Sequence, residues 1–133
     1  MTDSQKSPAR SVFWDDLQER LQDPGYLRDY VTQSLRISTI DRLVNRLAAA
    51  LEAQDVTKAE VARRLNTEAA TIRRLFTQTG HNPTLGTLTE VAGALGFRVE
   101  LVAMSDDERE QVTTPLRDGV MPAGVGRSTS ELR

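Results

Sequence analysis

The sequence predicts a small, mainly α-helical protein with one β-strand towards its C-terminal end. Apolar residues recur every three or four positions over most of residues 11–96, which is the spacing of helices that bury one face. Serine, threonine or aspartate precedes several of these runs, as at helix starts. From Phe97 the pattern changes to an alternation of apolar and polar residues, which is typical of a strand. The length of 133 residues suits one domain with extensions.

Composition excludes several function classes. The chain has no cysteine, so it has no disulfide framework, no thiolate zinc site and no cysteine nucleophile. His81 is the only histidine, and no motif groups a nucleophile, a general base and metal ligands. We therefore predict that the protein is not an enzyme, with no catalytic residue, no cofactor and no metal ion.

Hydropathy and charge bear on location and partner. No stretch approaches the run of about 18 apolar residues that a membrane helix needs, and residues 1–10 lack the apolar core of a secretory signal. We expect a soluble, cytoplasmic protein without a membrane partner. The net charge is −2, but residues 41–104 hold eight basic and seven acidic residues and are nearly neutral. Four of these arginines form two pairs, Arg63–Arg64 and Arg73–Arg74, and a local basic face can coexist with a neutral chain.

Residues 1–37 predict a disordered start and a helical extension over residues 11–37. Residues 1–10 are polar without apolar periodicity, so we expect them to be disordered. Residues 11–21 predict a short helix whose inward positions are Phe13, Trp14, Leu17 and Leu21. Asp23 and Pro24 are a typical cap and first-turn proline, and the helix that they open has Tyr26, Leu27, Tyr30, Val31 and Leu35 inward. We interpret Trp14, Tyr26 and Tyr30 as packing residues and not as a ligand cage.

Residues 38–96 predict a compact helical domain. Ser38 and Asp41 resemble a capping box, which would begin a new helix that runs to about Gln54. Thr84 can cap the last helix of the domain, and Gly96 would close it.

Between these helices lie two shorter ones separated by a tight turn. Thr57 and Glu60 form a second capping box, after which Val61, Ala62 and Leu65 give one apolar face. Asn66 follows, and asparagine tolerates the left-handed backbone that a sharp turn often requires. The next helix carries Ile72, Leu75 and Phe76 inward.

Residues 97–133 predict a strand and a tail. Phe97, Val99 and Leu101 alternate with polar neighbours, which predicts a strand over residues 97–104. A single strand after a helical domain has no partner in its own chain, so we expect it to pair with its symmetry mate in a homodimer. Residues 105–133 contain Pro115, Pro122 and several glycines with little periodicity, so we expect a flexible tail.

Four short motifs follow one another in this domain: KAEVARRL at 58–65, TIRRL at 71–75, NPTL at 82–85 and ALG at 94–96. By their order and spacing they resemble the phage-repressor-like (XRE) helix-turn-helix family, and the resemblance covers about residues 41–96. It implies a lambda-repressor-like domain in which one short helix crosses the DNA backbone while the next enters the major groove. The chain departs from the family at Asn66, where glycine is usual, and at Glu68, where serine or threonine is usual. The second helix begins with Ala69–Ala70, where family members often have longer polar side chains.

The resemblance and the helical projection assign candidate DNA contacts. At 3.6 residues per turn, several side chains lie opposite the apolar face of the second helix. The base-facing candidates are Ala69, Ala70, Arg73, Arg74 and Thr77. The phosphate-contacting candidates are Thr57, Lys58, Thr67, Glu68, His81 and Asn82. Arginine binds the two acceptors of guanine, and an alanine methyl packs on the methyl of thymine. A solvated helix face is the competing interpretation for Arg73–Arg74, and we favour it for Arg63–Arg64.

The order of helical domain, strand and polar tail resembles antitoxins of toxin–antitoxin modules of the HigA and HipB type. The run LQDP at 21–24, with the tyrosines that follow it, is similar to the start of some HigA-like antitoxins. The resemblance implies double-stranded operator DNA, a second copy of the chain and a cognate toxin as partners, with repression of its own operon. Two alternatives stay open. One is a stand-alone transcriptional repressor or activator without a toxin, and the other is a protein-interaction adaptor that has lost DNA binding.

Overall fold

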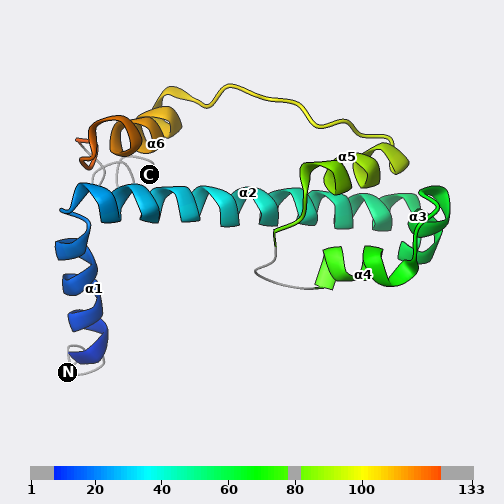
Figure 1. Ribbon diagram of the computed structural model, residues 1–133, viewed down its shortest axis with the longest axis horizontal. Helices are drawn as coiled ribbons and strands as arrows, with labels where there is room; N and C mark the ends of the chain where they lie inside the picture. The colour runs from blue at the N-terminus through cyan, green and yellow to red at the C-terminus, as the bar shows by residue number, and fades with distance from the viewer. Residues whose placement is uncertain (1–7, 78–81, 124–133) are drawn as a thin grey trace. The chain divides into compact units, whose positions relative to one another are not determined.

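Six helices make up the part of the chain that the structure describes (Figure 1). The structure is a computed structural model that describes residues 8–77 and 82–123. Its helices are α1 (Pro8–Arg20), α2 (Pro24–Gln54), α3 (Lys58–Arg64), α4 (Ala69–Thr77), α5 (Leu85–Ala94) and α6 (Asp106–Asp118). The prediction of a mainly helical protein is confirmed. No helix in the described ranges is both long enough and apolar enough to cross a membrane.

The chain divides into two compact units. Unit 1 consists of residues 1–34 and 103–133, and unit 2 consists of residues 35–102. The described part of unit 1 therefore holds α1, the start of α2 and α6. Unit 2 holds the rest of α2 together with α3, α4 and α5.

α2 is one uninterrupted helix of 31 residues where the sequence predicted two helices. It begins as predicted, because the N–H of Tyr26 donates to Asp23 Oδ2 at 2.9 Å and Asp23 thereby caps the helix. The second start predicted at Ser38 and Asp41 is wrong. The Ser38 hydroxyl donates to the carbonyl of Leu35 at 3.4 Å, as serine does inside a helix. Residues 26–54 contain neither glycine nor proline, so nothing interrupts the helix there.

Unit 2 has a hydrophobic core shared by its four helices. The buried members are Leu47, Ala50 and Leu51 of α2, Val61 and Ala62 of α3, Ile72 and Leu75 of α4, and Leu88, Val91 and Ala92 of α5, with Leu95 just beyond α5. In each helix they recur at spacings of one, three or four residues, which places them on one face. Burial of one large aliphatic side chain contributes roughly 1.5–3 kcal/mol. This shared core therefore holds α3 and α4 in one arrangement.

Both ends of α5 follow the signals in the sequence. Thr84 Oγ1 accepts from the N–H of Thr87 at 3.1 Å, so Thr84 caps the helix as predicted. At the other end Gly96 has a φ of 89°, in the left-handed region that favours glycine. The N–H of Phe97 there donates to the carbonyl of Ala92 at 2.8 Å. This is the Schellman closure, and it confirms that Gly96 ends α5.

The strand predicted over residues 97–104 is not formed within the chain. None of these residues lies in a helix, a turn or a strand. The physical reason is that a strand needs a neighbour for its ladder, and no second strand occurs in residues 8–77 and 82–123. Among the described residues this segment has no strand to pair with, so its pairing with a second copy of the chain stays a prediction.

The predicted disorder at both ends of the chain is wrong for residues 8–10 and 106–118, which are helical. α1 begins at Pro8, so residues 8–10 are helical. Asp106–Asp118, predicted as part of a flexible tail over residues 105–133, form α6. Ser105 Oγ accepts from the N–H of Glu108 at 3.2 Å, and three acidic residues in the first turn suit the positive end of the helix dipole. Residues 1–7 and 124–133, which complete the two predicted tails, lie outside the described residues.

α6 packs on the start of α2 within unit 1. Arg28 donates from Nε to the carbonyl of Leu116 at 3.1 Å and from Nη2 to that of Arg117 at 3.4 Å. Gly119 ends α6 with a φ of 72°, and a Cβ at this position would lie 2.8 Å from Cβ of Pro24. Both the backbone angle and the close approach therefore require glycine here. These contacts join segments far apart in sequence, which explains why periodicity alone did not reveal α6.

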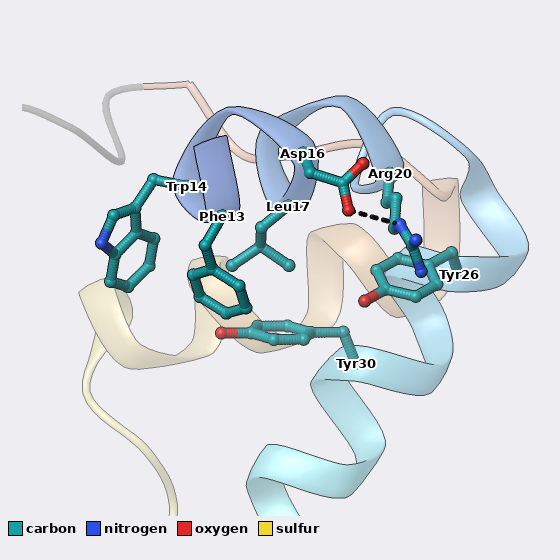
Figure 2. A pocket seen from close by; sticks show the side chains of 7 residues that line it. All are labelled: Phe13, Trp14, Asp16, Leu17, Arg20, Tyr26 and Tyr30. Carbon is teal, nitrogen blue, oxygen red and sulfur yellow. Dashed lines mark ion pairs between the residues drawn. The ribbon is translucent and has the colours of Figure 1, made fainter. Parts of the chain in front are cut away.

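Unit 1 also carries an exposed aromatic surface (Figure 2). The rings of Phe13 and Trp14 meet edge to face with centroids 5.3 Å apart. Side chains of α1 and of the start of α2 line a cavity of about 400 Å³; they are Phe13, Trp14, Asp16, Leu17, Arg20, Tyr26 and Tyr30. Trp14 is 50% exposed and Tyr30 is 43% exposed, so their interpretation as packing residues is only partly correct.

Candidate nucleic-acid interface

α3 begins at the predicted cap, but only half of the capping box is formed. Thr57 Oγ1 accepts from the N–H of Glu60 at 3.0 Å. The carboxylate of Glu60 bonds to Arg63 and Arg64 and so faces the later part of α3. Lys58, the first residue of α3, has its Nζ 5.5 Å from the centre of the Phe76 ring. This cation–π contact joins the start of α3 to the end of α4.

A tight turn over residues 65–68 joins α3 to α4 (Figure 1). The N–H of Thr67 donates to the carbonyl of Ala62 at 2.9 Å, and the N–H of Asn66 donates to that of Arg63 at 3.1 Å. This Schellman pair requires a left-handed residue at its centre, and Asn66 has a φ of 55°. The prediction that Asn66 takes the left-handed conformation is confirmed.

α4 separates into a buried and an exposed side. Ile72 and Leu75 face the core, where they are 1% and 3% exposed. Four of the predicted base-facing residues lie on the exposed side; they are Ala70, Arg73, Arg74 and Thr77. The fifth, Ala69, is half-buried and packs against the core, which leaves it little surface for a DNA base. Thr77 donates its hydroxyl to the carbonyl of Arg73 at 2.8 Å, so its oxygen is already engaged within α4.

The predicted phosphate contacts occupy different situations. Thr67, Glu68 and Asn82 are exposed at the two ends of the segment that contains α4. The carbonyl of Glu68 accepts from the N–H of Thr71 at 3.0 Å, so Glu68 contributes its backbone to the start of α4. Thr57 is exposed but its oxygen caps α3, and Lys58 is half-buried over Phe76. His81 lies outside the described residues.

The first arginine pair, Arg63–Arg64, is bound within unit 2. Arg63 donates from Nε to Glu60 Oε1 at 2.9 Å, and Arg64 donates from Nε to Glu60 Oε2 at 3.1 Å. Arg64 also donates from Nη1 to the carbonyl of Ala94 at 2.9 Å, which ties the end of α3 to the end of α5. Hydrogen bonds first from Arg63 and then from Arg64 lower the pKa of Glu60 to about 2. Both exposed arginines are therefore bound to groups of unit 2, and Arg64 joins α3 to the end of α5.

The second arginine pair, Arg73–Arg74, makes no ion pair among the described residues. Both side chains are exposed. Among the described residues their guanidinium groups have no anionic partner, although arginine offers five N–H donors. α4 is amphipathic, with an apolar side fixed in the core and a cationic side that points away from it.

Two contacts were not predicted from the sequence. The stacking of Lys58 on Phe76 joins residues on different helices, and no local pattern indicates it. The ion pairs of Arg63 and Arg64 with Glu60 could have been predicted, because acidic and basic residues three and four apart on a helix are neighbours.

The chain was compared with models of protein families, with curated proteins and with solved structures, and no match was found in any of the three.

Proposed function

We propose that this protein binds double-stranded DNA in a sequence-specific manner, with α4 in the major groove and α3 across the backbone. The observation that carries the proposal is the exposed pair Arg73–Arg74, which makes no ion pair among the described residues and lies on a short helix whose opposite side is fixed in the core. A base-contacting helix needs this combination, because a side chain reads one base position only when its helix is held rigidly.

The exposed residues of α4 have the right chemistry for base contacts. An arginine fork binds O6 and N7 of guanine, which is the commonest specific contact in the major groove. Ala70 lies one turn before Arg73 and Arg74, and its methyl group suits contact with a thymine methyl. We assign Arg74 the deepest position and Ala69 a packing role.

Phosphate contacts fall to the ends of the neighbouring elements. Thr67 and Asn82 are exposed and uncharged, and they can donate to phosphate oxygens. Glu68 is exposed beside the start of α4, and its charge repels phosphate. We expect weak non-specific binding as a result, so that the affinity for the preferred site depends strongly on the base contacts.

We also propose a finer fold for unit 2. Unit 2 has a capped short helix, a tight turn, a second short helix and a further capped helix around one core. This order supports a lambda-repressor-like domain with α3–α4 as its helix-turn-helix, because the turn geometry and the buried positions are those that such a pair requires.

We further propose an antitoxin that represses its own operon, with a stand-alone regulator as the alternative. The resemblance of the sequence supports this role, and the exposed Phe13, Trp14 and Tyr30 of unit 1 favour a protein partner, since aromatic residues dominate protein interfaces. Co-expression with the protein encoded next to this chain tests it. Neutralised toxicity that is lost in a Trp14→Ser/Tyr30→Ser variant supports an antitoxin, and the absence of a toxic neighbour supports the stand-alone regulator.

DNA binding is tested by selection from a random duplex library with the purified full chain. We expect one motif to be enriched, and enrichment to disappear in the Arg73→Ala/Arg74→Ala variant. The matched control is Arg63→Ala/Arg64→Ala, which removes the same charge from α3 and should still enrich the motif. Absence of any enriched motif would overturn the proposal and leave the adaptor as the better interpretation.

A further inference from the structure

The segment Phe97–Met104 exposes apolar side chains, and its backbone from 98 to 103 has no hydrogen-bond partner among the described residues. Phe97 is 43% exposed, Val99 is 39% exposed and Leu101 is fully exposed. Among the described residues, no backbone N–H from 98 to 104 donates to a backbone carbonyl. A segment with these properties offers both a ladder and an apolar face to another strand.

We propose that two copies of this segment pair in antiparallel fashion about a two-fold axis through Val99. In this register Arg98 of one copy lies opposite Glu100 of the second copy, and Glu100 lies opposite Arg98. On the other face Phe97 lies opposite Leu101, and Val99 lies opposite itself. The inference deepens the proposed function, on which it rests, because a two-fold dimer matches a palindromic DNA site.

Charge complementarity selects this register. An axis through Glu100 would place two carboxylates opposite each other, and an axis through Arg98 would place two guanidinium groups opposite each other, which destabilises a sheet. An axis through Leu101 leaves both charges without an opposite charge across the pair. An axis between two residues would place apolar side chains opposite polar ones on one face. The axis through Val99 alone forms two ion pairs across the dimer.

The geometry within one chain agrees with this arrangement. Arg98 Nε already donates to Glu100 Oε2, so the two side chains lie on the same side of the segment and within reach of each other. In the dimer, the Arg98 and Glu100 side chains of the second copy would lie beside those of the first. The four charges would alternate in sign and sum to zero. On the opposite face, the fully exposed Leu101 would be covered by Phe97 of the second copy. The register therefore uses every exposed side chain from 97 to 101.

Charge reversal tests the register. Arg98→Glu and Glu100→Arg each place like charges opposite each other twice, whereas the double variant restores two opposite pairs with the positions exchanged. Analytical ultracentrifugation of the full chain over a range of concentrations gives the dimer dissociation constant. We expect each single variant to raise it roughly tenfold, and the double variant to return it close to the wild-type value. Circular dichroism of each variant checks that the helices are intact.

Three outcomes would overturn the inference: a monomeric wild-type chain, single variants with unchanged dimers, or a double variant that is no better than the single ones. Failure of DNA binding is distinguished from these outcomes, because the library selection is measured separately from the oligomeric state. A dimer with the expected charge dependence but no enriched DNA motif supports the register and overturns the DNA-binding proposal.

Discussion

The two arginine pairs of unit 2 have the same composition but different surroundings. Arg63–Arg64 follow Glu60 by three and four residues and are bound by its carboxylate. The residues that precede Arg73–Arg74 by the same distances are Ala69, Ala70 and Thr71, which offer no charge. One pair is consequently bound within unit 2, and the other makes no ion pair among the described residues.

This difference changes how the small side chains of Ala69 and Ala70 are interpreted. In the sequence these two small side chains count against base contacts, because the proteins that it resembles often carry longer polar side chains there. In the structure they leave the guanidinium groups of the next turn without a carboxylate partner on α4. The availability of a charged group therefore depends on its neighbours on the helix as much as on its exposure.

The largest effect is expected from Ala70→Glu, which gives α4 the arrangement of α3. The new carboxylate would lie three residues before Arg73 and four before Arg74, where it can bind both and also repels phosphate. We expect affinity for the selected DNA motif to fall by roughly 100-fold or more, measured by fluorescence anisotropy. The matched control, Ala70→Gln, adds the same bulk without charge and should lose much less. Equal losses for both variants would contradict the explanation by charge.

A smaller loss is expected from Arg74→Ala. Removal of one base contact should cost about 1–3 kcal/mol on the selected motif and relax the preference at one base position. Binding measured on the selected motif and on a scrambled duplex separates the two contributions. If both duplexes lose the same affinity, Arg74 contacts only phosphate, and Arg73 becomes the candidate for base contact.

Lys58→Ala tests whether Lys58, whose ammonium group stacks on Phe76, also contacts a DNA phosphate. If Lys58 leaves Phe76 to contact phosphate, the variant weakens binding to all sequences about equally and lowers the salt slope by about one. We expect this smaller, sequence-independent loss, and the measurement is binding at several salt concentrations. An unchanged salt slope together with a lower melting temperature would show that Lys58 serves the α3–α4 contact alone.

The smallest effect is expected from Glu60→Gln, which removes the negative charge that binds the first pair and replaces one of its two acceptor oxygens by an amide nitrogen. The pKa of Glu60 is lowered from 4.5 to about 2, so its contribution to stability is present above pH 4.5 and is lost as the pH falls towards 2. Exposed ion pairs contribute little, so the difference in melting temperature should be small. Thermal unfolding of wild type and variant between pH 7 and pH 2 checks it. The difference should shrink across that window, and a difference independent of pH would contradict the assignment.

Local signals in the sequence predicted the parts of unit 2 that depend on nearby atoms. Thr57 and Thr84 cap helices through the N–H group three residues later, and Asn66 and Gly96 close helices through bonds within one turn. The exposed side of α4 also followed from helical periodicity. Each of these features needs only a few consecutive residues, which explains why sequence reasoning found them.

Several of the missed features depend on distant partners or on the absence of a helix breaker, and one had local signals that were overlooked. Ser38 carries a cap signal, but the uninterrupted run around it keeps α2 helical. α6 has local signals that were overlooked beside Pro115, because Ser105 caps its start and Gly119 closes its end, whereas the hydrogen bonds from Arg28 to carbonyl groups near its end follow from no local pattern. In the candidate site, the half-buried position of Ala69 depends on core packing from other helices. Its predicted base contact was therefore the weakest of the set.

The closures after α3 and α5 have a consequence for how fast this fold is reached. In both, the N–H and carbonyl groups that meet are separated by only a few residues, so the bonds require no prior assembly of the core. Helical domains dominated by local contacts fold within microseconds to milliseconds. We therefore expect the bend between α3 and α4 to form early in refolding, before α5 completes the core, so that the angle between the two helices is present from an early stage of each folding event.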